Sequence, residues 1–250
     1  MRRILEILIA TTCCALAAAQ TFEVASINTR TDGTGDIYTP KPFRFDFSGA
    51  RITIENFRLS DLITYAYDIK YYELFGEPRW ADIDRYNVSA KAPDGTSLNR
   101  EAARPMMRAL LADRFHLRAH TEKREMPVYM LVVAKGGPKF RESPAGAQKI
   151  LTQESKGRGY MMTVSSGDMA QLTGEFSKGN NVDRPVIDKT GLTGTYDYKL
   201  EWGDDAAADA DAGTVSVFTA FQEQLGLRLR PSRAPVQVLI IDRAERPSEN

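Results

Sequence analysis

The chain has 250 residues, of which 42% are hydrophobic and 26% are charged, and its formal net charge at pH 7 is zero. This composition is typical of a globular protein with one large domain or two small ones. The neutral balance disfavours a nucleic-acid partner and an anionic-membrane partner, because both are recognised by clustered basic residues.

Residues 1–19 have the pattern of a secretory signal peptide. Two arginines precede a short apolar stretch, and three alanines follow it. This pattern predicts cleavage between Ala19 and Gln20 and export to the periplasm or the medium. A lipid anchor on Cys13 or Cys14 is an alternative. Both cysteines lie in this segment, so the mature chain is expected to have no disulfide and no thiolate metal site. No other segment has enough consecutive apolar residues to span a membrane.

Two strands are expected near the start of the mature chain, at Phe22–Ile27 and around Phe43–Phe47. An internal repeat follows. "RITIENFRLSDLITYAYDI" and "YMMTVSSGDMAQLTGEF" each predict a strand and then a helix. The apolar helix faces contain Leu59, Leu62 and Ala66 in the first copy and Met169, Leu172 and Phe176 in the second.

The later parts of the two copies also match. The segments "RYNVSAKA" and "TYDYKLEW" both alternate apolar and polar residues, which predicts strands with one buried face. The segments that begin at Met107 and Val217 each predict an amphipathic helix followed by a strand, a turn and a second strand. The last two strands of each copy are therefore expected to form a hairpin.

Together these elements predict an α+β fold of two pseudo-repeats, each strand-helix-strand-helix-strand-strand, with helices packed on antiparallel or mixed sheets. The first repeat, with the N-terminal strands, spans 20–138, and the second spans 160–250. The polar segment 139–159 is expected to be a linker. One pseudo-symmetric sheet is favoured over two lobes, because neither copy alone has a large core.

The letters Asp188-Lys189-Thr190-Gly191 resemble two catalytic motifs. A phosphorylated aspartate of an ion pump requires membrane spans, which this chain is not expected to have. The Lys-Thr-Gly motif of penicillin-recognising enzymes requires a Ser-x-x-Lys motif, which the sequence lacks. The corresponding part of the first copy has no such letters, so a turn before a strand is the favoured interpretation.

A second candidate is "RWADIDRY", where Trp80, Asp82 and Asp84 concentrate two carboxylates beside an aromatic ring. Such a group is compatible with a sugar or calcium site. The favoured alternative is a turn in which Trp80 is buried, Asp82 is a cap and Asp84 pairs with a nearby arginine. The acidic segment from Gly203 to Gly213 lacks the closing glutamate of a calcium loop, and a solvated loop is expected there.

The two histidines, His116 and His120, are spaced as a pair of metal ligands would be on a helix. Their segment predicts a strand instead, which places them about 13 Å apart at roughly 3.3 Å per residue. The sequence therefore predicts no metal site and no cofactor. It also has no Gly-x-Ser-x-Gly nucleophile motif, and no catalytic residue is predicted.

The segments "LSDLITYAY", "GEPRWADIDRYNVSAKAP", "ALLADRFHLRAHTEKREMPVYMLVVAKGGPK", "RPVIDKTGLTGTYDYKLEW" and "APVQVLIIDRAERPSEN" resemble a family of uncharacterised, soil-associated bacterial proteins. The resemblance covers nearly the whole chain from Thr21 to Asn250. It implies an exported protein with a domain of unknown function, and some relatives are joined to membrane metalloproteases. It implies no catalytic residues, and the chain has no His-Glu-x-x-His motif.

The leading hypothesis is an exported, non-enzymatic module that binds a peptide, an envelope protein or a cell-wall component through exposed strand edges. The candidate binding residues are Trp80, Asp82, Asp84, Asp188 and Lys189. One alternative is a hydrolase or carbohydrate-active enzyme that uses Asp82, Asp84 or Asp188. Another is an extracytoplasmic sensor domain for a membrane partner.

Overall fold

The computed structural model describes residues 21–29, 43–156, 159–178, 182–203 and 215–247. The predicted signal peptide with its cleavage site at Ala19 and Gln20, and the acidic segment from Asp204 onward, lie outside these residues. None of the described helices is long and apolar enough to cross a bilayer.

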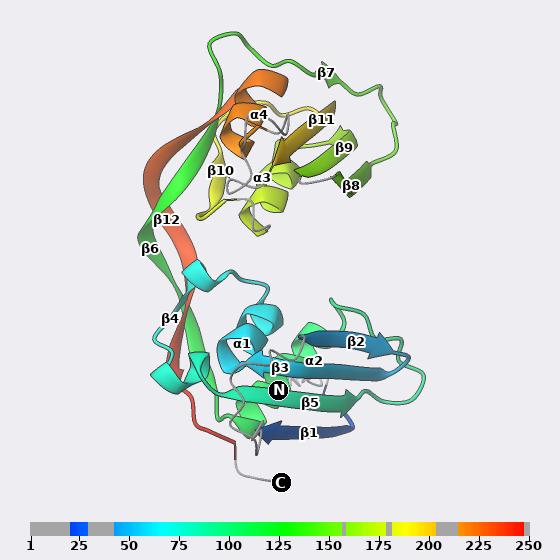
Figure 1. Ribbon diagram of the computed structural model, residues 1–250, viewed down its shortest axis with the longest axis vertical. Coiled ribbons are helices and arrows are strands. Elements are labelled where there is room, and N and C mark those ends of the chain that lie inside the picture. Colours follow the sequence, from blue (N-terminus) through cyan, green and yellow to red (C-terminus); the bar gives the residue numbers. More distant parts are fainter. Residues whose placement is uncertain (1–20, 30–42, 157–158, 179–181, 204–214, 248–250) are drawn as a thin grey trace, which may run out of the picture. The chain divides into compact units, whose positions relative to one another are not determined.

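The described chain has an α+β architecture, as the sequence predicts (Figure 1). The elements up to the second long helix are β1 (Val24–Thr29), β2 (Arg44–Ser48), β3 (Arg51–Arg58), α1 (Leu59–Tyr67), η1 (Tyr71–Glu73), β4 (Leu74–Phe75), η2 (Arg79–Asp82), β5 (Arg85–Lys91) and α2 (Ala103–Arg114). The remaining elements are β6 (Arg118–Val133), β7 (Arg141–Glu142), β8 (Ile150–Lys156), β9 (Gly159–Gly167), α3 (Met169–Lys178), β10 (Val186–Asp188), β11 (Tyr196–Gly203), α4 (Val217–Gln224) and β12 (Leu227–Arg243).

Two compact units share the chain. Unit 1 takes its described residues from 1–68, 77–118 and 243–250, and unit 2 takes them from 69–76 and 119–242. The units therefore cut across the successive halves that the repeat predicts. The expectation of one pseudo-symmetric sheet is wrong, because the described strands form three separate four-stranded sheets.

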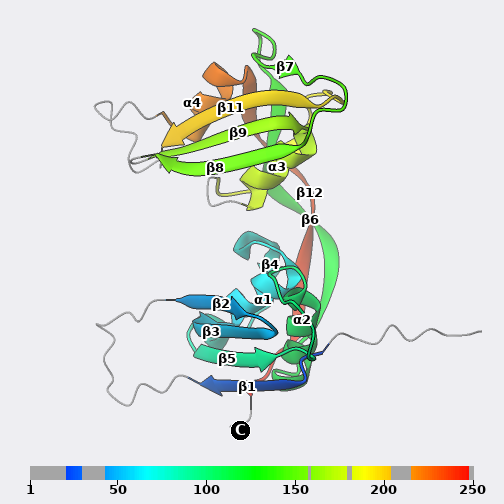
Figure 2. The ribbon, with the colours of Figure 1, turned by 90° about the vertical axis from the view of Figure 1, so that its right-hand side faces the viewer.

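Unit 1 contains an antiparallel sheet of order β1-β5-β3-β2, with α1 and α2 on one face (Figure 2). The alternation that the sequence shows in β5 matches the burial, because Tyr86, Val88 and Ala90 face the core. The expected helix face is also confirmed, since Leu59, Leu62 and Ala66 are completely buried.

Unit 2 contains a sheet of order β7-β11-β9-β8, and Figure 2 shows α3 and α4 on one face of it. Its core joins this sheet to both helices through Phe176, Trp202 and Phe221. The segment 139–159, expected to be a linker, contains β7 and β8, which pair with β11 and β9. Most of β8 is exposed, because it is an edge strand, so its residues have the polar composition of a loop.

The hairpins expected at the end of each copy are not formed. Each pair of expected strands is one continuous strand, β6 or β12, and the two long strands pair with each other. They run antiparallel, since the main-chain nitrogen of Ala134 donates to Gly226 at one end, and His120 contacts Asp242 at the other. The polar middle of each strand resembles a turn, but its main chain pairs with the other long strand.

Two short strands complete this second sheet of unit 2. β10 runs parallel to β6 and β4 runs parallel to β12, which gives the order β10-β6-β12-β4. Gly76 follows β4 with φ of +79°, and a Cβ atom there would lie 2.8 Å from the carbonyl oxygen of Ile241. Glycine is thus required where β4 ends against β12.

The same bulge occurs in both helix-covered sheets. The pairing of β3 with β5 shifts at Asn56, and the pairing of β9 with β11 shifts at Ser166, 110 positions later (166 − 56). Both residues have positive φ, of 69° and 54°. The main-chain nitrogen of Asn56 donates to the side-chain oxygen of Asn87 (2.9 Å), and that of Ser166 donates to Asp197 (3.0 Å). A side chain on the central strand thus satisfies the donor that each bulge releases.

Helix α3 begins at an aspartate cap that provides a pH-dependent test. The carboxylate of Asp168 accepts a hydrogen bond from the main-chain nitrogen of Gln171 (2.6 Å), and this bond, assisted by Lys149, lowers the pKa of Asp168. A carboxyl group with a lowered folded-state pKa stabilises the protein above its unfolded pKa of about 4, and this contribution disappears as the pH falls through the lowered value. We expect Asp168→Ala to lower the free energy of unfolding by about 1 kcal/mol at pH 7.

Urea unfolding of the wild type and Asp168→Ala at pH 7 and near pH 2.5 measures this effect, and the difference is expected to shrink at the lower pH. Asp168→Asn is the control, because asparagine also caps helices but does not titrate. A difference that stays the same at both pH values would show that the charge of Asp168 contributes nothing.

Candidate functional site

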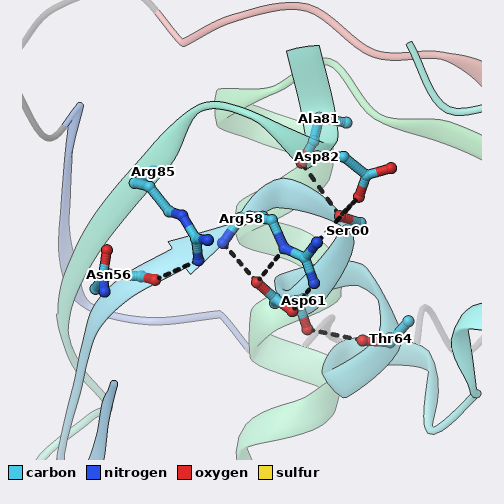
Figure 3. A network of polar contacts seen from close by, with 8 residues as sticks. All are labelled: Asn56, Arg58, Ser60, Asp61, Thr64, Ala81, Asp82 and Arg85. Atoms are coloured by element: carbon cyan, nitrogen blue, oxygen red, sulfur yellow. Dashed lines mark hydrogen bonds and ion pairs between the residues drawn. The ribbon is translucent and has the colours of Figure 1, made fainter. Parts of the chain in front are cut away.

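A polar network surrounds the start of helix α1 in unit 1 (Figure 3). The carboxylate of Asp61 accepts three hydrogen bonds from Arg58, one from the main-chain nitrogen (2.8 Å) and two from the guanidinium group (3.0 Å each). The hydrogen bond to Asp61 raises the pKa of Arg58. Asp61 therefore serves the first turn of the helix, where free main-chain donors need acceptors.

Ser60 connects this helix to η2. Its side chain is completely buried, its hydroxyl group donates to the carboxylate of Asp82, and the carbonyl oxygen of Ala81 lies 3.2 Å away (Figure 3). The guanidinium group of Arg58 lies 3.9 Å from the same carboxylate. A buried serine held in this way positions η2 against α1, and its hydroxyl group is out of reach of a substrate.

Trp80 and Asp84 meet the C-terminal segment of the chain. Arg246 binds the carboxylate of Asp84 through Nε (2.7 Å), and its guanidinium carbon lies 5.1 Å from the centre of the Trp80 ring. Burial and the charge of Asp84 raise the pKa of the neighbouring Tyr86 to about 12. The turn interpretation predicts a nearby arginine for Asp84, but the partner is Arg246, 162 positions away. The interpretation is also wrong for Trp80, which is half-buried, and for Asp82, which is the last residue of η2 and accepts from the Ser60 side chain instead of capping a helix.

The carboxylates of Asp82 and Asp84 thus bind other side chains of the same protein. A pair of glycosidase carboxyl groups has one member kept protonated by an apolar environment and the other facing the sugar. Here Asp82 contacts Ser60 and Arg58, whereas Asp84 binds Arg246. This arrangement favours a structural role for both residues.

Asp188 and Lys189 belong to unit 2, whereas Trp80, Asp82 and Asp84 belong to unit 1. The carboxylate of Asp188, the last residue of β10, accepts hydrogen bonds from the main-chain nitrogen (2.8 Å) and the hydroxyl group (2.7 Å) of Thr190. The main-chain nitrogen of Lys189 donates to Leu131 on β6, and Gly191 has φ of +73°. This is the geometry of a turn after β10, as the sequence predicts.

The two histidines have different acidic partners. His116 lies before β6 with φ of 48°, so the expectation that it belongs to a strand is wrong, and it faces Glu245 at 3.5 Å. His120 lies on β6 and contacts Asp242 at 2.8 Å. Among the residues that the structure describes, no group of three or more histidine, cysteine, aspartate or glutamate side chains is arranged to hold a metal ion.

The structure reveals an aromatic group that the sequence analysis did not single out. We call it the aromatic edge, and it consists of Phe43, Phe45, Phe47, Phe57 and Tyr65. The ring of Phe45 lies 4.7 Å from that of Tyr65 and 5.3 Å from that of Phe47, centre to centre. Its members on β2 alternate along the strand, which is the one sequence signal that would have indicated a common face.

Two arginines lie over the aromatic edge. The guanidinium carbon of Arg100 is 4.7 Å from the ring centre of Phe45, and that of Arg85 is 5.3 Å from the ring centre of Phe43. Phe43 nevertheless remains 61% exposed. Exposed phenylalanine beside arginine is the composition of many interaction surfaces.

Some main-chain N–H and C=O groups of β2 also point away from the rest of the sheet. β2 is the outer strand of its sheet within the described part of the chain. A two-residue turn joins Ser48 to its partner Arg51, so Ser48 and Asp46 are expected to bond to β3. The N–H and C=O groups of Phe45 and Phe47 then point away from β3, towards the free side of the strand.

A comparison with known families assigns the chain. The model of a family described as a protein of unknown function, DUF3738, matches residues 60–244. The chain belongs to this family. The DUF3738 match includes η2, the turn after β10 and most of both units, whereas β1, β2 and β3 precede it. No curated protein and no solved structure matches the chain.

Proposed function

We propose that this DUF3738 protein is an exported binding module that takes up an extended peptide segment of an envelope protein along β2. The observation that carries the proposal is the aromatic edge, which places the half-buried rings of Phe45 and Phe47 on β2 and the exposed ring of Phe43 directly before it. The outward main-chain groups of β2 lack a described strand partner. Addition of a strand to a sheet edge is a general mode of peptide recognition.

The two faces of β2 provide different kinds of contact. Phe43, Phe45 and Phe47 lie on the helix-covered side, where Phe45 and Phe47 pair with the buried residues Ile54 and Ile52. An apolar side chain of an added strand would lie beside these rings and extend the core of unit 1. Arg44 and Asp46 on the opposite face form an exposed ion pair (3.2 Å). The aromatic side therefore provides most of the affinity, because it offers the larger apolar area.

Export is part of the proposal, and it rests on the basic and apolar pattern of residues 1–19. A partner in the cell envelope follows from that location. The site lies on the sheet edge and not at Trp80, Asp82 and Asp84, because those side chains already contact Arg246, Ser60 and Arg58.

We also propose that the two halves of the chain are copies of one unit. The proposal is supported by the matching strand orders β1-β5-β3-β2 and β7-β11-β9-β8 and by the matching bulges at Asn56 and Ser166. A duplicated scaffold offers two sheets with similar edges, which suits a protein that binds extended segments.

The binding proposal is tested with linear peptides selected on the purified protein from a random display library. We expect Phe45→Ala to lower the affinity for the selected peptides at least tenfold, because the central ring of the aromatic edge is lost. This loss corresponds to about 1.4 kcal/mol of binding free energy. Phe47→Pro should have a similar effect, since it removes an outward N–H group without breaking a bond to β3.

Tyr160→Ala is the matched control, because Tyr160 is a partly exposed aromatic residue stacked on Trp202 in unit 2. Fluorescence anisotropy gives the affinities, and circular dichroism confirms folding of each variant. Peptides that bind both β2 variants as tightly as the wild type would overturn the proposed site.

A further inference from the structure

The central strands of the two helix-covered sheets are covered to different extents. In unit 1, β1 pairs with β5 along the six residues from Tyr86 to Lys91. In unit 2, β7 occupies the corresponding place but pairs only with Tyr196 and Asp197 of β11. From Tyr198 onward, no described strand lies on that side of β11.

A glutamine side chain occupies part of this uncovered edge. Gln224 accepts a hydrogen bond from the main-chain nitrogen of Glu201 (2.8 Å) and donates one to its carbonyl oxygen (2.7 Å). The side-chain amide thus makes the two bonds that a paired strand residue would make. In a strand, the main-chain N–H and C=O groups of every second residue point to the same side. Those of Lys199 therefore point to the same side as those of Glu201, and no described group bonds to them.

A pocket with a volume of 440 Å³ lies at this place, and Lys139, Phe140, Arg141, Asp197, Lys199 and Gln224 are among its lining residues. This volume is within the usual range for small-ligand sites. Phe140 provides an apolar wall, because its ring packs on Tyr196 (5.1 Å) and Tyr198 (6.0 Å).

The charges around the pocket favour an anionic group. Three of the lining residues are cations, namely Lys139, Arg141 and Lys199, and all three are exposed. Lys139 donates to the carbonyl oxygen of Glu223 (2.8 Å), Arg141 lies 3.8 Å from Asp197, and Lys199 pairs with Glu201 (2.7 Å). Because exposed ion pairs contribute little to stability, the carboxylates of a ligand can compete with these partners.

The only lining carboxylate, that of Asp197, already accepts hydrogen bonds from the side chains of Ser143 and Ser165 and from the main chain of Ser166. These bonds lower the pKa of Asp197, the bond from Ser143 being the strongest cause.

The geometry points to a second peptide site, in unit 2, where a short extended segment with acidic side chains pairs with Lys199 at the open edge of β11. Its main chain bonds to Lys199, in the gap between β7, which pairs with Asp197, and the side chain of Gln224, which bonds to Glu201. Its carboxylates lie among Lys139, Arg141 and Lys199. The site is separate from β2 and does not depend on the function proposed for the aromatic edge.

A labelled synthetic peptide of alternating glutamate and valine tests the second site, with a peptide of alternating lysine and valine as the charge control. We expect the purified protein to bind the glutamate peptide at least tenfold more tightly at low salt. Lys199→Pro should abolish this binding, because it removes the free N–H group but leaves the bonds between β11 and β9. The amide of Lys199 should exchange with solvent more slowly once the peptide is bound.

Two further variants separate this site from others. Lys149→Ala removes a cation beside Asp168, away from the pocket lining, and should leave the affinity unchanged. Phe45→Ala should also leave the affinity for the glutamate peptide unchanged. The proposal for β2 and the inference for β11 can therefore fail independently, with different results. Equal binding of both peptides, or glutamate-peptide binding that survives Lys199→Pro, would overturn the inference.

Discussion

Replacing Gly226 by alanine is expected to lower the free energy of unfolding by about 4 kcal/mol. Gly226 has φ of +65°, a backbone conformation that costs an L-residue roughly 1–2 kcal/mol. An added Cβ atom would also lie 2.0 Å from the carbonyl oxygen of Gly137, a main-chain atom that is not free to move alone. The carbonyl group of Gly226 itself binds the main-chain nitrogen of Ala134, so the overlap would disturb the start of the β6–β12 pairing.

A residue with a similar backbone conformation in unit 1 provides a matched comparison. His116, 110 positions earlier (226 − 116), also has positive φ, but its side chain is 64% exposed. We expect His116→Gly to change the stability by less than about 1 kcal/mol, because released strain and added freedom of the unfolded chain largely offset each other. Urea unfolding of both variants gives the two values, and a Gly226→Ala variant as stable as the wild type would contradict the predicted overlap.

Phe221→Ala is expected to destabilise unit 2 by about 4 kcal/mol. Phe221 is completely buried, and its ring meets that of Phe176 edge to face at 4.7 Å. Phe176 in turn packs against Trp202 at 5.2 Å, so the substitution opens a cavity between α3, α4 and β11. Buried phenylalanine rings removed in this way usually cost about 3–5 kcal/mol.

Fluorescence of tryptophan can report on this unit alone. The chain has two tryptophans, with Trp80 in unit 1 and Trp202 in unit 2. In a Trp80→Phe background, Trp202 fluorescence reports the unfolding transition of unit 2 in urea. The substitution Phe221→Ala should lower the midpoint of this transition sharply. Ile150→Ala should leave the midpoint almost unchanged, because the side chain of Ile150 is 49% exposed. If Phe221→Ala left the Trp202 transition in place, Phe221 would not be part of a cooperative core.

The elements with one buried face were predictable from the sequence. In β11, Tyr196, Tyr198 and Leu200 alternate with exposed or half-buried residues, so the period of two was visible. Helix α3 likewise buries Met169, Leu172 and Phe176 at helical spacing. The turn at Asp188 was predictable too, because its hydrogen bonds are local and join residues two positions apart.

The continuity of β6 and β12 was not predictable in the same way. Long exposed stretches such as residues 118–127 carry many polar side chains, and the strand pairing itself is made by main-chain groups, which every sequence has. The partner strand begins 94 positions after the end of β6 (227 − 133), and local patterns contain no information about it. Strand β8 was missed for the related reason that an edge strand buries little of itself.

The candidate site was predictable only in part. The residues around Trp80 do gather, and the expected arginine partner of Asp84 exists, but no spacing rule links Asp84 to Arg246. Asp188 and Lys189 belong to unit 2, although the sequence analysis grouped them with Trp80, Asp82 and Asp84 as candidate binding residues. The aromatic edge depends on β2 being an outer strand, which follows from sheet order and not from composition.

Binding of an extended segment along β2 is measured most directly by amide hydrogen exchange of the protein with and without a selected peptide. Slower exchange of the amides of Phe45 and Phe47, with little change at Asp46, is the predicted result, because only the outward N–H groups gain a partner. Unchanged exchange along β2, with protection centred instead on Trp80 to Asp84, would contradict the account.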